Sequence, residues 1–276
     1  MMQLAQFGAI VRYEMIMHWR RRGWLGVVLG LIAMPIILLL VFGDAAEAQR
    51  LWAAASGLPT QTLSELNTIT VTMYTAMPLY VITLLMIPVL AAEVIPHDRQ
   101  VKVRELLDGL PISTGIYLAG KLFGYWLSVA IGSGAAMLIV GVTLYLLKGA
   151  FAFGDYISLW VEMILGIGLI NSGLSLLLAA GQPTRRRALT IGIVFVVMCM
   201  FGNLGEQSRQ YNTVVAYLNP GRPVITGYLL LSKWIPESIL HVSRQDMYGA
   251  IFVGLLQVAV VGLIVGLWMR RSTARD

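Results

Sequence analysis

Residues 115 to 122 read GIYLAGKL, and the first seven match the Gly-x-x-x-x-Gly-Lys spacing of a nucleotide-binding phosphate loop. That loop needs Ser or Thr after the lysine, because the hydroxyl ligates the Mg²⁺ of the nucleotide. Leu122 stands at this position and has no hydroxyl. The segment also follows the polar stretch RELLDGLPIST rather than a buried strand. We therefore interpret the match as accidental and expect another role for Lys121.

No other pattern in the sequence predicts an active site. His18, His97 and His241 lie far apart and share no spacing typical of metal ligands. Cys199, the one cysteine, lies in an apolar run, where a small packing residue is expected. No catalytic triad or paired-carboxylate site is recognisable, so we expect neither enzymatic activity nor a metal site in this chain.

The composition predicts a membrane protein. Of 276 residues, 58% are hydrophobic and 12% are charged, whereas soluble domains have about 45–50% apolar and about 25% charged residues. A membrane-spanning helix needs about 20 predominantly apolar residues. We expect an all-α membrane protein with six transmembrane helices, over residues 24–42, 68–92, 122–147, 157–181, 188–204 and 249–268.

We expect one transmembrane domain over residues 1–276, with an uncleaved first span. Its predicted parts are an N-terminal helix (1–23), two spans (24–92), a cytoplasmic loop (93–121), three spans (122–204), an outer loop (205–248), and the last span with a cytoplasmic tail (249–276). The first segment is predicted to be an amphipathic helix on the membrane surface, with Arg12 and Glu14 on its polar face. Its apolar positions are Leu4, Phe7, Ile10, Val11, Met15 and Trp19.

The basic residues predict the orientation. Fourteen of the 20 lysines and arginines fall on one side of the six predicted spans, which by the positive-inside rule places both termini in the cytoplasm. The net charge of +6 then attracts anionic lipid, at about 1 kcal/mol per basic residue, and requires no nucleic acid partner. Lys121 is expected to extend toward the headgroups. The fourteen are Arg12, Arg20, Arg21, Arg22, Arg99, Lys102, Arg104, Lys121, Arg185, Arg186, Arg187, Arg270, Arg271 and Arg275.

Polar residues within the predicted spans are candidates for a translocation path, because burying them in hydrocarbon is costly. Glu162 lies about two turns from the outer end of the fourth span. Its side chain either reaches the outer interface, contacts a substrate or carries a proton. Asn171 and Ser175 either line a path or bond between helices. Small-xxx-small pairs at Gly26/Gly30, Gly120/Gly124 and Gly262/Gly266 suit a compact bundle or a dimer seam.

The cytoplasmic loop, residues 93 to 121, is the densest polar segment. Asp98 is placed to cap a short helix that Asp108-Gly109 and Pro111 would end. Apolar residues recur at helical spacing, so one face suits a soluble partner or, alternatively, the lipid headgroups. These apolar positions are Val103, Leu106, Leu107 and Leu110.

At these residues the sequence resembles the permease subunits of type-2 ATP-binding-cassette (ABC) exporters. Their loop has a glutamate, two apolar positions, Pro-Ile-Ser, a spacer and Gly-Lys. Lys102, Val103 and Arg104 replace the Gly-Thr-Leu that often precedes the glutamate. The matching positions are Glu105, Leu106 and Leu107 (one residue early), Pro111, Ile112, Ser113, Gly120 and Lys121, with Leu218, Asn219 and Pro220 in the outer loop.

The resemblance implies a coupling helix that contacts a separate ABC ATP-binding subunit, and an outer helical hairpin between spans 5 and 6 with a gate at Leu218, Asn219 and Pro220. It implies two permease chains, as a homodimer or heterodimer, in the cell's inner membrane, with ATP and Mg²⁺ bound by the partner and no cofactor here. The substrate stays open. Alternatives are a proton-coupled carrier using Glu162 and a non-transporting scaffold. The coupling residues would be Arg99, Lys102, Arg104, Glu105, Leu106, Leu107, Pro111, Ile112 and Ser113.

Overall fold

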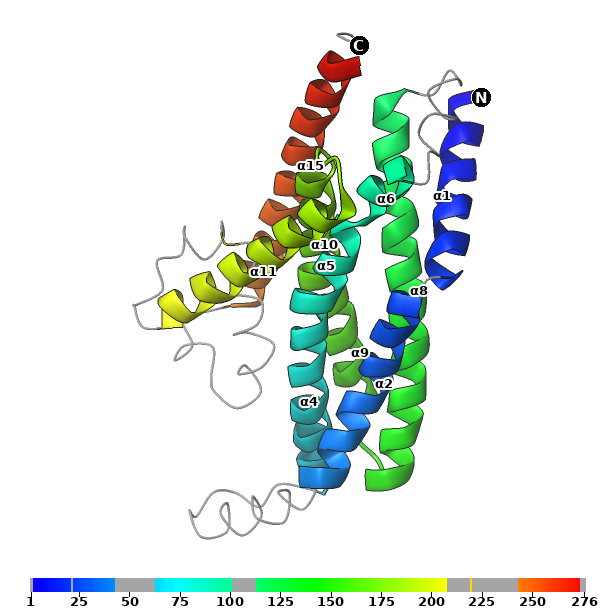
Figure 1. Cartoon of the computed structure of the whole chain (residues 1–276). Helices are drawn as coiled ribbons and strands as arrows, with labels where there is room; N and C mark the ends of the chain where they lie inside the picture. Colours follow the sequence, from blue (N-terminus) through cyan, green and yellow to red (C-terminus); the bar gives the residue numbers. More distant parts are fainter. Residues whose placement is uncertain are drawn as a thin grey trace.

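The computed structural model describes residues 2–20, 22–42, 63–100, 113–207, 219 and 243–273, and these residues form helices and short connections without a strand. Figure 1 shows long helices gathered into a bundle. The helices are α1 (Met2–Arg20), α2 (Arg22–Phe42), α4 (Leu63–Val81), α5 (Ile87–Ala92), α6 (Val94–Gln100), α8 (Thr114–Lys148), α9 (Phe153–Glu162), α10 (Ile170–Ala179), α11 (Arg185–Gln207) and α15 (Arg244–Thr273), with π-helical turns η1 (Ile82–Met86) and η2 (Met163–Leu169).

Five helical segments among the described residues are long and apolar enough to cross a membrane, which is the architecture of a multi-pass membrane protein. They are Gly23–Val41, Thr70–Asp98, Thr114–Lys148, Phe153–Ala179 and Arg244–Met269, and each overlaps a predicted span. The remaining predicted span, 188–204, lies within α11, which is helical but is not among these five. A sixth crossing therefore stays a prediction. α1 begins and α15 ends at the same end of the bundle (Figure 1), here called the terminal end.

Helices occupy both ends of the segment predicted to be a loop, residues 93 to 121. α6 occupies its first part, and α8 begins at Thr114, capped by the Ser113 hydroxyl, which accepts a hydrogen bond from the Ile116 amide at 3.3 Å. α8 has 35 residues, a length of about 52 Å at 1.5 Å per residue. It ends at Gly149, whose φ of 85° suits a residue without a side chain. Because the hydrocarbon core is about 30 Å thick, α8 is too long to lie wholly within it.

The N-terminal helix packs differently from the prediction. α1 lies along the beginning of α8 (Figure 1), so it is not an isolated surface helix. Glu14, predicted to be on the polar face, is fully buried, whereas Leu4 is 79% exposed. The reason is electrostatic: α1 turns Glu14 inward toward a lysine of α8, described below.

Two glycines allow this close approach. A Cβ at Gly120 would lie 2.7 Å from Ile10 Cγ2, and one at Gly124 would lie 2.6 Å from Glu14 Cβ and 3.1 Å from the Val11 carbonyl oxygen. Among the alternatives left open by the small-xxx-small pattern, this pair therefore serves packing within one chain. Gly120 and Gly124 form the seam between α1 and α8.

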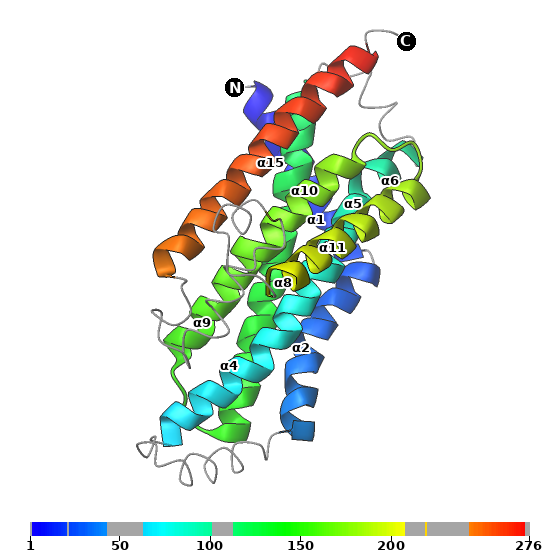
Figure 2. The ribbon, with the colours of Figure 1, turned by 90° about the vertical axis from the view of Figure 1, so that its left-hand side faces the viewer.

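Two of the crossing segments are interrupted by π-helical turns that face each other. η1 joins α4 to α5, η2 joins α9 to α10, and η1 contacts η2. A Cβ on Gly168 of η2 would lie 3.5 Å from Thr83 Cγ2 of η1. Buried apolar side chains surround this contact, among them Leu79, Ile82, Ile87, Ile167 and Ile170. Figure 2 shows α15 running obliquely beside α10, the continuation of the second interrupted helix.

The seam predicts opposite effects for two glycine substitutions on α8. Gly124→Ala forces α1 away from α8 and should lower the free energy of unfolding by about 1–3 kcal/mol, the usual cost of overpacking. Gly134→Ala is the matched control, because nothing lies within 4 Å of a Cβ there. It should be neutral or stabilising by up to about 1 kcal/mol, since alanine favours helix. Denaturant titration in detergent micelles measures both. Equal stability of the two variants would contradict the packing of α1 on α8.

Candidate functional site

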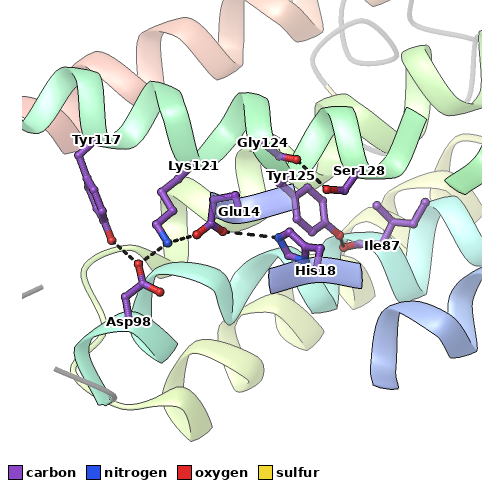
Figure 3. A network of polar contacts seen from close by, with 9 residues as sticks. All are labelled: Glu14, His18, Ile87, Asp98, Tyr117, Lys121, Gly124, Tyr125 and Ser128. Atoms are coloured by element: carbon purple, nitrogen blue, oxygen red, sulfur yellow. Dashed lines mark hydrogen bonds and ion pairs between the residues drawn. The ribbon is translucent and has the colours of Figure 1, made fainter. Parts of the chain in front are cut away.

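A buried lysine joins three helices at the terminal end of the bundle. The Nζ atom of Lys121 on α8 forms ion pairs with Glu14 Oε1 on α1 and with Asp98 Oδ2 on α6 (Figure 3). Its side chain is 1% exposed, and those of Glu14 and Asp98 are 0% and 2% exposed. Since a buried charge is tolerated only when it is paired, these contacts are required by the fold rather than optional.

Further groups surround this ion cluster, which we define as Glu14, Asp98 and Lys121. The Tyr117 hydroxyl donates to Asp98 Oδ2 at 3.0 Å, so Asp98 accepts from both a cation and a phenol. His18 Nε2 lies 3.7 Å from Glu14 Oε2, one helical turn along α1. The second carboxylate oxygen of Glu14 thus faces His18, while the first is paired with Lys121.

The cluster is connected to the first interrupted helix through Tyr125. The ring of His18 packs edge-on against that of Tyr125, with 4.9 Å between centroids. The Tyr125 hydroxyl donates to the Ile87 carbonyl at 2.5 Å, at the point where η1 passes into α5 (Figure 3). Contacts thus run without a gap from the ion cluster to the backbone next to η1.

The ion cluster lies far from the other end of the bundle. The Asn67 side-chain amide donates to the Lys148 carbonyl at 2.8 Å, so the start of α4 and the end of α8 lie at one level. Lys121 precedes Lys148 by 27 residues of the same helix, a distance of about 40 Å along α8.

A second ion pair lies at the beginning of α6. Arg185 Nε, at the start of α11, donates to Glu93 Oε2 at 2.6 Å. The Arg185 side chain is 50% exposed and that of Glu93 is 10% exposed, so solvent weakens this pair relative to the buried cluster. Glu93 precedes α6 and Asp98 lies near its end, so polar contacts hold the short helix at both ends.

The three candidate residues for a translocation path have different surroundings. The Ser175 hydroxyl donates to the Pro88 carbonyl at 2.8 Å, which is a bond between helices. Asn171 is fully buried, and neither polar atom of its amide has a hydrogen-bond partner among the described residues. Glu162 is the last residue of α9 and is half-buried, and its carboxylate interacts electrostatically with Arg244 at the start of α15. Among these three, Asn171 is the residue whose buried side-chain amide makes no hydrogen bond within the described part of the chain.

Most residues assigned by resemblance fall outside the described part of the chain. Arg99 lies on α6, Ser113 caps α8, and Asn219 is half-buried outside any helix. Their assigned roles stay predictions, as do those of the others. The residues outside the described ranges are Lys102, Arg104, Glu105, Leu106, Leu107, Pro111, Ile112, Leu218 and Pro220.

Sequence reasoning missed the ion cluster because it treated each member separately. Lys121 was expected among the headgroups and Glu14 on a polar face, and both interpretations are wrong, since the two side chains are buried against each other. Asp98 was expected as a helix cap, and its burial against Lys121 was not foreseen, while the helix that it would cap lies outside the described residues. A signal was available: Gly120 and Gly124 bracket the lysine, and small residues allow another helix to approach. Ile10, Glu14 and His18 also recur every four residues, which places them on one helix face.

Comparison with known proteins gives no match to any family model and none to any curated protein. Among the described residues, no group of three or more His, Cys, Asp or Glu side chains could hold a metal ion. The site is thus characterised by its own geometry, as a buried charge cluster that joins helices.

The burial of Lys121 makes a single substitution more harmful than a combined one. Lys121→Met leaves two buried carboxylates without their cation and should cost about 3–5 kcal/mol of unfolding free energy. The triple variant Glu14→Gln, Asp98→Asn, Lys121→Met removes every charge of the cluster and should be more stable than Lys121→Met alone. Denaturant titration of both variants in detergent checks the order. If the single variant unfolds like wild type, Lys121 is not buried in this cluster.

Proposed function

We propose that this chain is the membrane-spanning subunit of an ATP-driven ABC exporter, which works as two permease chains with separate ATPase subunits. The observation that supports this most directly is the position of Lys121. This residue matches the Gly-Lys of the family's loop pattern, and it is also the centre of the ion cluster. Lys121 thus matches the family pattern and also joins three helices next to the loop.

Ion pairs join the two helices that flank the loop, which suits a docking element. It leaves α6 at Gln100 and enters α8 at Ser113. Asp98 and Lys121 connect the two flanking helices, and Glu14 adds α1. A force on the loop is therefore passed to three helices at once, instead of being absorbed by bending between α6 and α8.

In this proposal, ATP binding closes the partner subunits and presses on residues 98–113, with both termini on the cytoplasmic side of the inner membrane. α8 carries the displacement across the bilayer because its 35 residues form one uninterrupted helix. α1 moves with it through the seam. The interrupted helices adjust at η1 and η2, since π-helical turns depart from the regular backbone pattern and often occur at functional positions. The substrate leaves on the outer side.

The proposal predicts that damage to the loop separates the partner from an intact membrane domain. Glu105→Arg with Leu106→Asp reverses one charge and puts a carboxylate on the predicted docking face. A charge buried in a contact usually costs a few kcal/mol. The tagged double variant, purified from native membranes, should therefore carry far less ATPase activity per chain than wild type. Its amount in the membrane should not change.

Glu162→Gln is the matched control, because it alters a carboxylate within a span and leaves the loop intact. It should retain the partner ATPase activity and ATP-dependent export. If the loop variant keeps its ATPase and its transport while Glu162→Gln abolishes proton-coupled flux, the chain is a secondary carrier. If wild type copurifies with no ATPase at all, the exporter proposal fails and the scaffold takes its place.

A further inference from the structure

A buried amide on α10 needs a partner that the surrounding side chains do not supply. Asn171 is 0% exposed, and neither its Nδ2 nor its Oδ1 atom has a hydrogen-bond partner among the described residues. The neighbouring hydroxyls of α10 are satisfied: Ser172 donates to the Leu169 carbonyl at 2.9 Å, and Ser175 donates to the Pro88 carbonyl at 2.8 Å. Since an unpaired buried amide is costly, Asn171 calls for a ligand.

Contacts on either side of Asn171 show where its side chain lies. One turn earlier, a Cβ on Gly168 would lie 3.5 Å from Thr83 Cγ2 of η1, and one turn later Ser175 bonds to the carbonyl of Pro88 in α5. Residues three or four apart share a helix face. Asn171 therefore faces the backbone between these two contacts, where η1 passes into α5.

That stretch of backbone lacks a donor of its own. The Ile87 N–H donates to the Ile82 carbonyl, as in a π-helical turn. Pro88 follows and has no N–H, so one carbonyl of η1 loses the donor that it would have in a continuous helix. Neighbouring side chains or ordered water satisfy such carbonyls in membrane helices. Tyr125 and Ser175 donate to the carbonyls of Ile87 and Pro88, which come after η1, so the carbonyl within η1 needs a further donor.

The groups that meet here require a neutral ligand that both donates and accepts. The Asn171 Nδ2 group donates, whereas Asn171 Oδ1 and the η1 carbonyl accept. A cation would be repelled by the amide hydrogens, and an anion would be repelled by the two carbonyl oxygens. Water is the smallest molecule with both functions, and buried water typically makes about three hydrogen bonds to groups that are otherwise unpaired.

We propose that the junction of η1 with α10 is a water-binding site, in which bound water accepts from Asn171 and donates to a carbonyl of η1. The water links the two interrupted helices beside the contact between η1 and η2, where both depart from regular helical bonding. The site lies within one chain and requires neither a partner subunit nor ATP, so it is independent of the exporter proposal.

The first test uses the full chain in detergent micelles, labelled with ¹⁵N in its asparagines. Nuclear Overhauser cross-peaks from water to a side-chain NH₂ group report water that stays beside that group. They should be stronger for Asn171 than for Asn67, the matched control, whose amide donates to the carbonyls of Lys148 and Ala150. Asn171→Leu identifies the signal by removing it. A cross-peak on Asn171 no stronger than that on Asn67 would overturn the site.

A double-mutant cycle separates bound water from tight packing of the amide. Asn171→Leu should lower the midpoint of thermal unfolding by several degrees, because it displaces the water from the η1 carbonyl. Pro88→Ala supplies an N–H to η1, so in that background Asn171→Leu should lower the midpoint by less than half as much.

Overpacking by leucine would cost the same in both backgrounds. Equal shifts in the two backgrounds would therefore contradict the proposal, as would a higher midpoint for Asn171→Leu than for wild type. Ser172→Ala is the control on the same helix, because its hydroxyl bonds only within α10 and its preceding turn, and it should change the midpoint little in either background.

Discussion

A lysine that is 1% exposed must keep its carboxylates, and much of this structure depends on that constraint. Separating Lys121 from Glu14 or Asp98 would leave a charge in a poorly solvated place, which costs far more than an exposed ion pair contributes. The pairing fixes the rotation of α1, which turns Glu14 inward at the expense of exposing Leu4. It also requires glycine at positions 120 and 124, where any side chain would meet α1.

The middle of the bundle is built on a different principle. There the backbone departs from a regular helix at η1 and η2. Side chains of neighbouring helices donate hydrogen bonds to backbone carbonyls of α5, directly after η1. Tyr125 donates to Ile87 and Ser175 donates to Pro88, so α8 and α10 hold the first interrupted helix on two sides. The buried amide of Asn171 lies on the same α10 face as Ser175, one turn away. The cluster thus joins helices at the terminal end, while the interrupted segments meet farther along the bundle.

The sequence predicted the parts of this fold that depend on local composition. Five apolar runs coincide with candidate spans, because hydropathy over about 20 residues decides whether a segment crosses a membrane. It did not predict the pairing of Glu14 with Lys121, which lie 107 residues apart, since helical periodicity assigns a face to a residue but not a partner. The π-helical turns were also missed, because a π turn leaves hydropathy unchanged. The predicted path residue Ser175 proved to be a helix-to-helix bond, an alternative that the sequence had left open.

The central claim of the proposed function is that the ion cluster passes motion from the loop between α6 and α8 to these two helices and α1. It is tested by the distance between spin labels at Leu4→Cys on α1 and Met77→Cys on α4, which are 79% and 65% exposed, in the proposed complex with an ATPase subunit, with and without ATP. Double electron–electron resonance should detect an ATP-dependent shift in the wild-type background. In the triple variant Glu14→Gln, Asp98→Asn, Lys121→Met, the partner should remain bound but the shift should be lost. The same shift in both backgrounds would contradict the account.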